Sequence, residues 1–203
     1  MKTLPLAAAV IACLCAGTAP AATVYLSPGT QTLSSGSPVT LDLNISGLGN
    51  GTALSAFDIS VNFDSADLSF EGAAFGDPVL GDQLDLGDLG LNGPTATPGN
   101  GTVDLIETDI FDSSSTLLSE QAANFTMVVL TFDALAGGTT PVTATINSLA
   151  DQESNPFTAS TQNASVTIEA SPVPLPSSLV LLTAGLLGLV AASCRRRRAS
   201  PLA

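Results

Sequence analysis

The sequence contains no histidine, and from Thr3 to Cys194 it contains no lysine or arginine. The side chains that usually transfer protons at neutral pH are therefore missing from this interval, which excludes a Ser–His–Asp arrangement and a lysine base. Histidine-based zinc sites are excluded for the same reason. A region without cations is also repelled by phosphate groups, so we expect no nucleic-acid partner.

Cysteine is confined to the two ends of the chain, at Cys13, Cys15 and Cys194. The region between them can form no disulfide and has no thiol chemistry, so an ordinary apolar core must stabilise it. A pair of carboxylates, as in glycosidases, is the catalytic device that remains. We expect that the protein is not an enzyme, and a weak hydrolase using two carboxylates is the alternative.

Aromatic residues are also scarce, with no tryptophan and a single tyrosine, Tyr25. Exposed Trp and Tyr rings offer a large contact area at a small entropic cost, and carbohydrate modules commonly stack sugars on them. Tyr25 alone cannot form such a platform. Carbohydrate binding is therefore the alternative function and not the favoured one.

All 18 carboxylates lie between Asp42 and Glu169, whereas the five bases are Lys2 and Arg195 to Arg198. This asymmetry indicates an acidic middle domain between two ends of a different kind. The first end combines Lys2 with an apolar run and small residues at Ala19 and Ala21, which predicts a signal peptide over residues 1–22. Cleavage is expected after Ala21 or Ala22.

The other end has three parts in a fixed order. Residues 171–178 form a proline- and serine-rich hinge, residues 179–193 are uncharged and apolar, and residues 194–203 contain four consecutive arginines. We expect 179–193 to be a transmembrane helix, because a chain-terminal apolar run flanked in this way is typical of an anchor. Arg195, Arg196, Arg197 and Arg198 would stay in the cytoplasm, so the acidic domain would face outward.

This tail resembles the PEP-CTERM sorting signal of Gram-negative bacteria. Val173, Pro174, Leu175 and Pro176 look like the VPLPA-type variant of its Pro-Glu-Pro motif, with Leu175 in place of the acid. The resemblance implies processing by the membrane protease-transpeptidase exosortase, of a subtype that Leu175 leaves open. It also implies an inner-membrane anchor with the domain in the periplasm, followed by transfer to the cell surface or release. A permanent C-terminal anchor is the other possibility.

Residues 23–170 alternate apolar and polar side chains in short runs. Residues 39–46 and 57–64 alternate without interruption, which predicts strands with one buried face, and residues 125–132 are apolar on both faces, as in an interior strand. Glycine-rich turns separate these runs, and only 115–123 has a helical period. The pattern predicts an all-β domain, an antiparallel β-sandwich or jelly roll.

The order of these segments also resembles a cohesin-like module, a fold related to carbohydrate-binding domains. The resemblance rests on the early strand GSPVTLDLNISG, on the segment LSAFDISVNFDSADLSF, and on the closing strand ASVTIE. It implies a protein-binding role. The partner would be a protein or polysaccharide of the cell envelope or the extracellular polysaccharide matrix.

Calcium is the one cofactor that the sequence suggests. Asp82, Asp85 and Asp88 recur at every third position in a loop-like segment and could direct oxygen atoms at a hard cation. A second acidic cluster comprises Asp104, Glu107, Asp109 and Asp112. The spacing fits no EF-hand, and a solvated acidic surface is the alternative interpretation of both clusters.

Overall fold

The computed structural model describes residues 22–49 and 51–170, together with Leu187. The predicted signal peptide, apart from Ala22, lies outside these residues, and so do the sorting motif, the arginine cluster and the predicted transmembrane helix, Leu187 excepted. Among the described residues, no helix is long and apolar enough to cross a membrane. The chain divides into two compact units, Met1–Ala170 and Ser171–Ala203.

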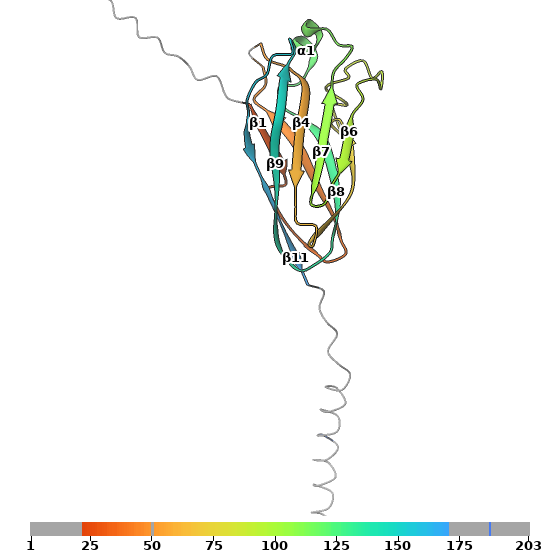
Figure 1. The fold of residues 1–203 in the computed structure, drawn as a ribbon, viewed down its shortest axis with the longest axis vertical. Coiled ribbons are helices and arrows are strands. Elements are labelled where there is room, and N and C mark those ends of the chain that lie inside the picture. Colours follow the sequence, from red (N-terminus) through yellow and green to blue (C-terminus); the bar gives the residue numbers. More distant parts are fainter. Residues whose placement is uncertain (1–21, 50, 171–186, 188–203) are drawn as a thin grey trace, which may run out of the picture. The chain divides into compact units, whose positions relative to one another are not determined.

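Within the described part of the first unit, eleven strands and one short helix form the domain (Figure 1). The strands are β1 (Thr23–Ser27), β2 (Thr30–Ser34), β3 (Pro38–Ser46), β4 (Leu54–Asn62), β5 (Leu68–Phe75), β6 (Thr95–Pro98), β7 (Thr102–Thr108), β8 (Phe125–Ala134), β9 (Gly138–Asp151), β10 (Ser160–Gln162) and β11 (Ala164–Glu169), and the helix is α1 (Ser114–Glu120).

The strands form two sheets, in the orders β10-β1-β3-β8-β5 and β2-β11-β9-β4-β7-β6. The predicted β-sandwich is confirmed, and β8 is an interior strand between β3 and β5, as its apolar sequence indicates. The sheets are mixed and not purely antiparallel, because β1 pairs with β10 and β2 pairs with β11 in parallel. The chain changes sheet between β1 and β2 and again between β10 and β11, so each of its first two strands runs parallel to one of the last strands, β1 beside β10 and β2 beside β11.

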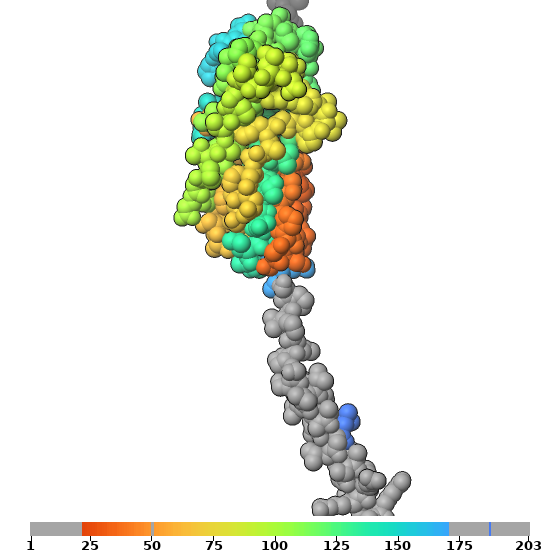
Figure 2. Space-filling model, turned by 90° about the vertical axis from the view of Figure 1, so that its right-hand side faces the viewer, coloured from red at the N-terminus to blue at the C-terminus, as the bar shows by residue number. Residues whose placement is uncertain are grey.

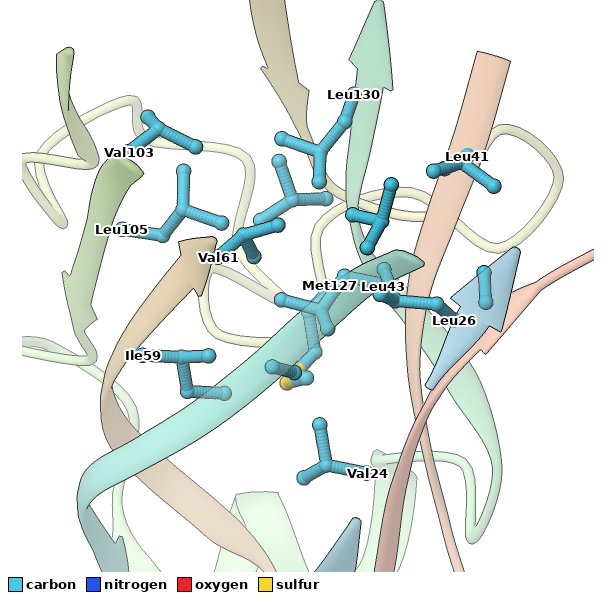
Figure 3. Close-up of a cluster of buried hydrophobic side chains, with 14 of the residues drawn as sticks. Val24, Leu26, Leu41, Leu43, Ile59, Val61, Val103, Leu105, Met127 and Leu130 are labelled. Atoms are coloured by element: carbon cyan, nitrogen blue, oxygen red, sulfur yellow. The ribbon is translucent and has the colours of Figure 1, made fainter. Parts of the chain in front are cut away.

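The core lies between the two sheets. Apolar side chains of β1, β3 and β8 face those of β4 and β7, and Figure 3 shows this contact around Leu43, Val61 and Met127. The period-two alternation of β1, β3, β4 and β7 puts their apolar side chains on this inner face. Phe132 is fully buried on β8, and its ring meets those of Phe63 and Phe70 edge-on, with centroids 5.1 and 5.7 Å apart.

The two ends of the sandwich differ. One end, called the α1 end, consists of the loop 76–94 between β5 and β6 and the segment 109–124, which contains α1. The domain finishes at Ala170 at the opposite end, where β11 stops beside the turn after β2 (Figure 1). The α1 end and Ala170 therefore lie at opposite ends of the domain (Figure 1).

Candidate functional site

Loop 76–94 is fixed to the sandwich at its start by Asp77. The Asp77 carboxylate accepts hydrogen bonds from the backbone N–H groups of Val79 at 2.8 Å, Leu80 at 2.9 Å and Thr126 at 2.9 Å. Burial opposes ionisation of Asp77, but these hydrogen bonds outweigh it and hold the pKa of Asp77 below its ordinary value. Burial, and then the charge of Asp77, raise the pKa of Asp42 on β3.

The loop separates the three aspartates that the sequence suggests as calcium ligands. Asp82 accepts a hydrogen bond from the Leu84 N–H at 2.9 Å. Asp85 is buried and accepts from the Leu89 and Gly90 N–H groups at 3.0 and 2.6 Å, whereas Asp88 is exposed with a left-handed backbone. Nowhere in residues 22–49 or 51–170 are three or more acidic side chains grouped so that they could hold a metal ion.

A buried polar network ties the end of the loop to strand β7. The Asn92 amide donates to Asp82 Oδ2 at 2.7 Å and to Glu107 Oε1 at 2.5 Å. Glu107 is only 1% exposed, because it continues the inward phase of Val103 and Leu105 along β7. Its second oxygen, Oε2, receives no hydrogen bond from the described residues.

Burial raises the pKa of Glu107 to about 9, with further contributions from the charge of Asp82, a hydrogen bond with Asp82 and the charge of Asp85. The Glu107 carboxyl is therefore protonated at neutral pH. A protonated carboxyl can donate a hydrogen bond, which agrees with the hydrogen bond between the Glu107 and Asp82 side chains. The network thus holds a protonated Glu107 next to Asp82 and Asn92.

Two amide side chains and one carboxylate join the loop to the segment that contains α1. Gln121 donates to the carbonyl of Gln83 at 2.8 Å, and the Gln83 side chain accepts from the Ala122 N–H at 2.8 Å. Asp112 accepts from the Leu86 N–H at 2.9 Å. Helix α1 itself begins at the N-cap Ser113, as short helices commonly do. Loop and helix segment therefore form one hydrogen-bonded unit.

The remaining acids of the second cluster serve local structure. Asp104 accepts from the Ser60 hydroxyl at 2.6 Å, and Asp109 accepts from the N–H groups of Phe111 and Asp112 at 3.1 and 2.9 Å. The acid with the most perturbed pKa, Glu107, is closed to a substrate by its burial. This arrangement fits a structural role better than acid–base chemistry.

Sequence reasoning placed Glu107 in an acidic cluster and missed its burial. The signal was present, because Val103, Leu105 and Glu107 share one face of a strand with period two. The partnership of Glu107 with Asn92 and Asp82 could not be read in this way, since it depends on how a long loop folds back. Tyr25, the only tyrosine, is half-buried on β1.

Comparison with known proteins identifies the tail and the fold separately. Residues 172–198 match the PEP-CTERM protein-sorting motif, so the chain carries the sorting signal of an exported protein directed to the cell envelope. This range includes the predicted Val173–Pro176 motif and the four arginines. No curated protein matches the chain.

The domain has the fold of a cohesin. The sixth cohesin of scaffoldin B from Acetivibrio cellulolyticus, solved in complex with a dockerin, is similar with a TM-score of 0.58 and 17% identity, covering 73% of this chain and 99% of that one. A non-cellulosomal cohesin from Archaeoglobus fulgidus is similar with a TM-score of 0.53 and 12% identity, covering 78% and 95%. At such identities the likeness establishes the fold alone, and it confirms the cohesin-like sandwich that the sequence predicts.

Proposed function

We propose that this protein is an exported binding module that exosortase sorts to the cell surface or the extracellular polysaccharide matrix, where its cohesin-like domain engages another protein. The observation that supports the proposal most is the pairing of a PEP-CTERM motif with a cohesin-like sandwich in one chain. The anchor would be transient, with the acidic domain in the periplasm and the arginines in the cytoplasm until processing.

The absence of cations from residues 3–194 supports a binding role over catalysis. The perturbed acid Glu107 is buried inside the domain and not in an open cleft. A glycosidase-type role would need two accessible carboxylates that face each other across one cleft. We therefore keep the expectation that the protein is not an enzyme.

Mass spectrometry of the mature C-terminus, on protein isolated from its own host, tests the sorting step. We expect the residues beyond about Pro176 to be lost. The double change Pro174→Ala and Pro176→Ala should prevent this loss, so that the C-terminus stays intact. Pro172→Ala lies just outside the four-residue motif, and this variant should still be processed. An unprocessed Ala203 terminus in the unmodified protein would show a permanent anchor instead.

The binding step is tested by passing envelope material from the host over the immobilised protein. We expect the retained material to be protein and to be lost when the material is first treated with protease. Retention of glycan after protease treatment would favour carbohydrate binding instead.

Carbohydrate binding is the second candidate function, and one feature favours it. An open hollow of about 460 Å³ lies at the end of β4, beside the turn before β7 and the first half of β9, and polar side chains of Asn62, Asp64, Ser65 and Asn100 line it next to Phe63. These groups could pair with sugar hydroxyls. Binding on a glycan array that is lost with Asn62→Ala and Asn100→Ala together would support this function.

A further inference from the structure

In loop 76–94, several polar side chains are buried and several large apolar side chains are exposed, the reverse of the usual distribution. Its polar residues Gln83, Asp85 and Asn92 are 6%, 8% and 5% exposed. Four large apolar residues of the same loop are exposed instead: Val79 (89%), Leu80 (52%), Leu89 (56%) and Leu91 (55%). Burial of an apolar side chain is favourable, and burial of a polar one is costly unless it is hydrogen-bonded. The loop is therefore arranged as a surface that another molecule would cover.

The exposed apolar side chains gather at the α1 end. We call the following six residues the apolar patch: Val79, Leu80, Leu89, Leu91, Ile110 and Phe111. The loop and the 109–112 segment are joined by the hydrogen bond from the Leu86 N–H to Asp112. Figure 2 shows the yellow loop projecting from the domain next to the green segment that contains α1. Large exposed apolar patches on soluble proteins commonly mark interaction surfaces.

The patch is held in position from beneath. The Asp85 carboxylate accepts from the N–H groups of Leu89 and Gly90, and Asn92, next to Leu91, is fixed by Asp82 and Glu107. The backbone that carries Leu89 and Leu91 is thus ordered before any partner arrives. Preorganisation of this kind lowers the entropic cost of binding.

The charge around the patch restricts what can cover it. Asp88, Asp109 and Asp112 belong to the same segments, and the chain has no lysine or arginine between residues 3 and 194. A second copy of the domain would bring another 18 carboxylates, and an anionic lipid surface would add further negative charge. A partner that places lysine or arginine beside its own apolar side chains would instead be attracted by the acids and would bury the patch.

We propose that the apolar patch at the α1 end is the docking surface for a basic protein segment, whose apolar side chains cover Leu89, Leu91 and Phe111 while its lysines or arginines face the surrounding aspartates. The inference rests on the proposed function as a binding module and names its interaction surface and the chemistry of its partner. The location suits an anchored protein, because Ala170 lies at the opposite end of the domain (Figure 1).

Site-specific photo-cross-linking of the full chain in its own host tests the location. The photoreactive residue p-benzoylphenylalanine replaces Leu91 in the patch, Leu135 beyond the end of β8, or Thr40 on an exposed sheet position. Leu135 is a matched control, because it is 49% exposed against 55% for Leu91. We expect a protein cross-link from position 91 only, and mass spectrometry should find lysine or arginine in the cross-linked peptide.

The other outcomes separate the inference from the proposed function. A protein cross-link from position 40 or 135, without one from position 91, would overturn the docking surface and leave the binding role intact. Cross-links from position 91 to lipid or to a second copy of the chain would overturn the basic partner. No protein cross-link from any position would contradict both.

A peptide probe tests the chemistry with purified protein. We expect an amphipathic Leu/Lys peptide to bind at least about tenfold more tightly than the matched Leu/Glu peptide. The double change Leu89→Ser and Leu91→Ser should lower the affinity for the Leu/Lys peptide about tenfold. Leu135→Ser should leave the affinity unchanged. If the unmodified protein, the double variant and the Leu135→Ser variant bound the Leu/Lys peptide with equal affinity, the binding would be due to unspecific charge attraction. That result would overturn the proposal.

Discussion

The sandwich and the α1 end differ in which side chains they bury and which they expose. In the strands, side chains such as Leu43 and Val61 are buried, and polar neighbours face solvent. In loop 76–94 the polar residues Asp85 and Asn92 are buried and the leucines at 89 and 91 are exposed. The sandwich is therefore stabilised by apolar burial, and the loop largely by hydrogen bonds of its polar side chains, both within the loop and to neighbouring segments.

This difference separates the part of the molecule that ensures folding from the part that is available for recognition. A core residue can be changed only at a cost to the whole domain, because the interior is closely packed. An exposed apolar residue on a preformed loop can be changed with little effect on folding. Substitutions in the two regions should therefore have separable effects on stability and on binding.

The largest expected effect is in the sandwich. Phe132→Ala should lower the free energy of unfolding by about 3–5 kcal/mol, because it removes a fully buried ring that packs against Phe63 and Phe70. Phe111→Ala, in the exposed patch, should change it by less than about 0.5 kcal/mol. Urea denaturation of both variants measures the contrast. A comparable loss in the two variants would show that Phe111 belongs to the core.

The next effect concerns the network under the loop. Asn92→Ala should cost about 1–3 kcal/mol, since it removes two hydrogen bonds and leaves the buried Glu107 carboxyl without the Asn92 donor. Asn147→Ala is the matched control, because exposed Asn147 also donates twice, to Asp58 and Ser60, and should cost less than about 1 kcal/mol. Hydrogen exchange should increase in loop 76–94 of the Asn92 variant. Unchanged exchange there would contradict the role of the network.

Glu107→Gln is expected to raise the stability of the folded protein, by a smaller amount than the two previous changes lower it. The pKa of Glu107 rises from an ordinary 4.5 to about 9 in the folded protein, so the folded state keeps a proton that the unfolded state releases. Its contribution to stability is therefore fully present below pH 4.5 and declines as the pH rises toward about 9. Glutamine imitates the protonated acid at every pH. The variant should be more stable by about 1 kcal/mol or more at pH 8 and equally stable near pH 4.

Thermal unfolding of the Glu107→Gln variant at several pH values, with Glu120→Gln as the control, measures this dependence. Glu120 ends α1 in an exposed position, and its replacement should have little effect at any pH. If the two variants followed the same pH profile, Glu107 would be ionised in the folded protein and the account of the network would be wrong.

The strands with a buried face were predictable from the sequence, and three of the four edge strands were not. The uninterrupted alternation of residues 39–46 and 57–64 locates β3 and most of β4, because one face of each is sealed by the core. Strands β2, β6 and β10 are largely polar and exposed, so their sequence resembles that of a turn. They are defined by pairing with distant strands, which local sequence does not encode.

The α1 end shows where sequence reasoning stops. The spacing of Asp82, Asp85 and Asp88 suggests that they bind one cation together. In the structure, Asp82 and Asp85 accept hydrogen bonds from different backbone N–H groups, and Asp88 is exposed to solvent. Aspartate side chains readily accept hydrogen bonds from N–H groups a few residues further along the chain, and this local use competes with metal binding. Spacing alone does not distinguish the two.

The smallest expected effect follows from that competition. Because the Asp82 and Asp85 carboxylates are already occupied by N–H donors, we expect EDTA to change the melting temperature by less than about 1 °C. Added calcium should likewise have little effect on the hydrogen exchange of loop 76–94. A drop of several degrees on chelation, reversed by calcium and absent from an Asp82→Asn variant, would show that a cation displaces these hydrogen bonds. It would then be the cation, and not the Asn92 network alone, that orders the loop and presents the apolar patch.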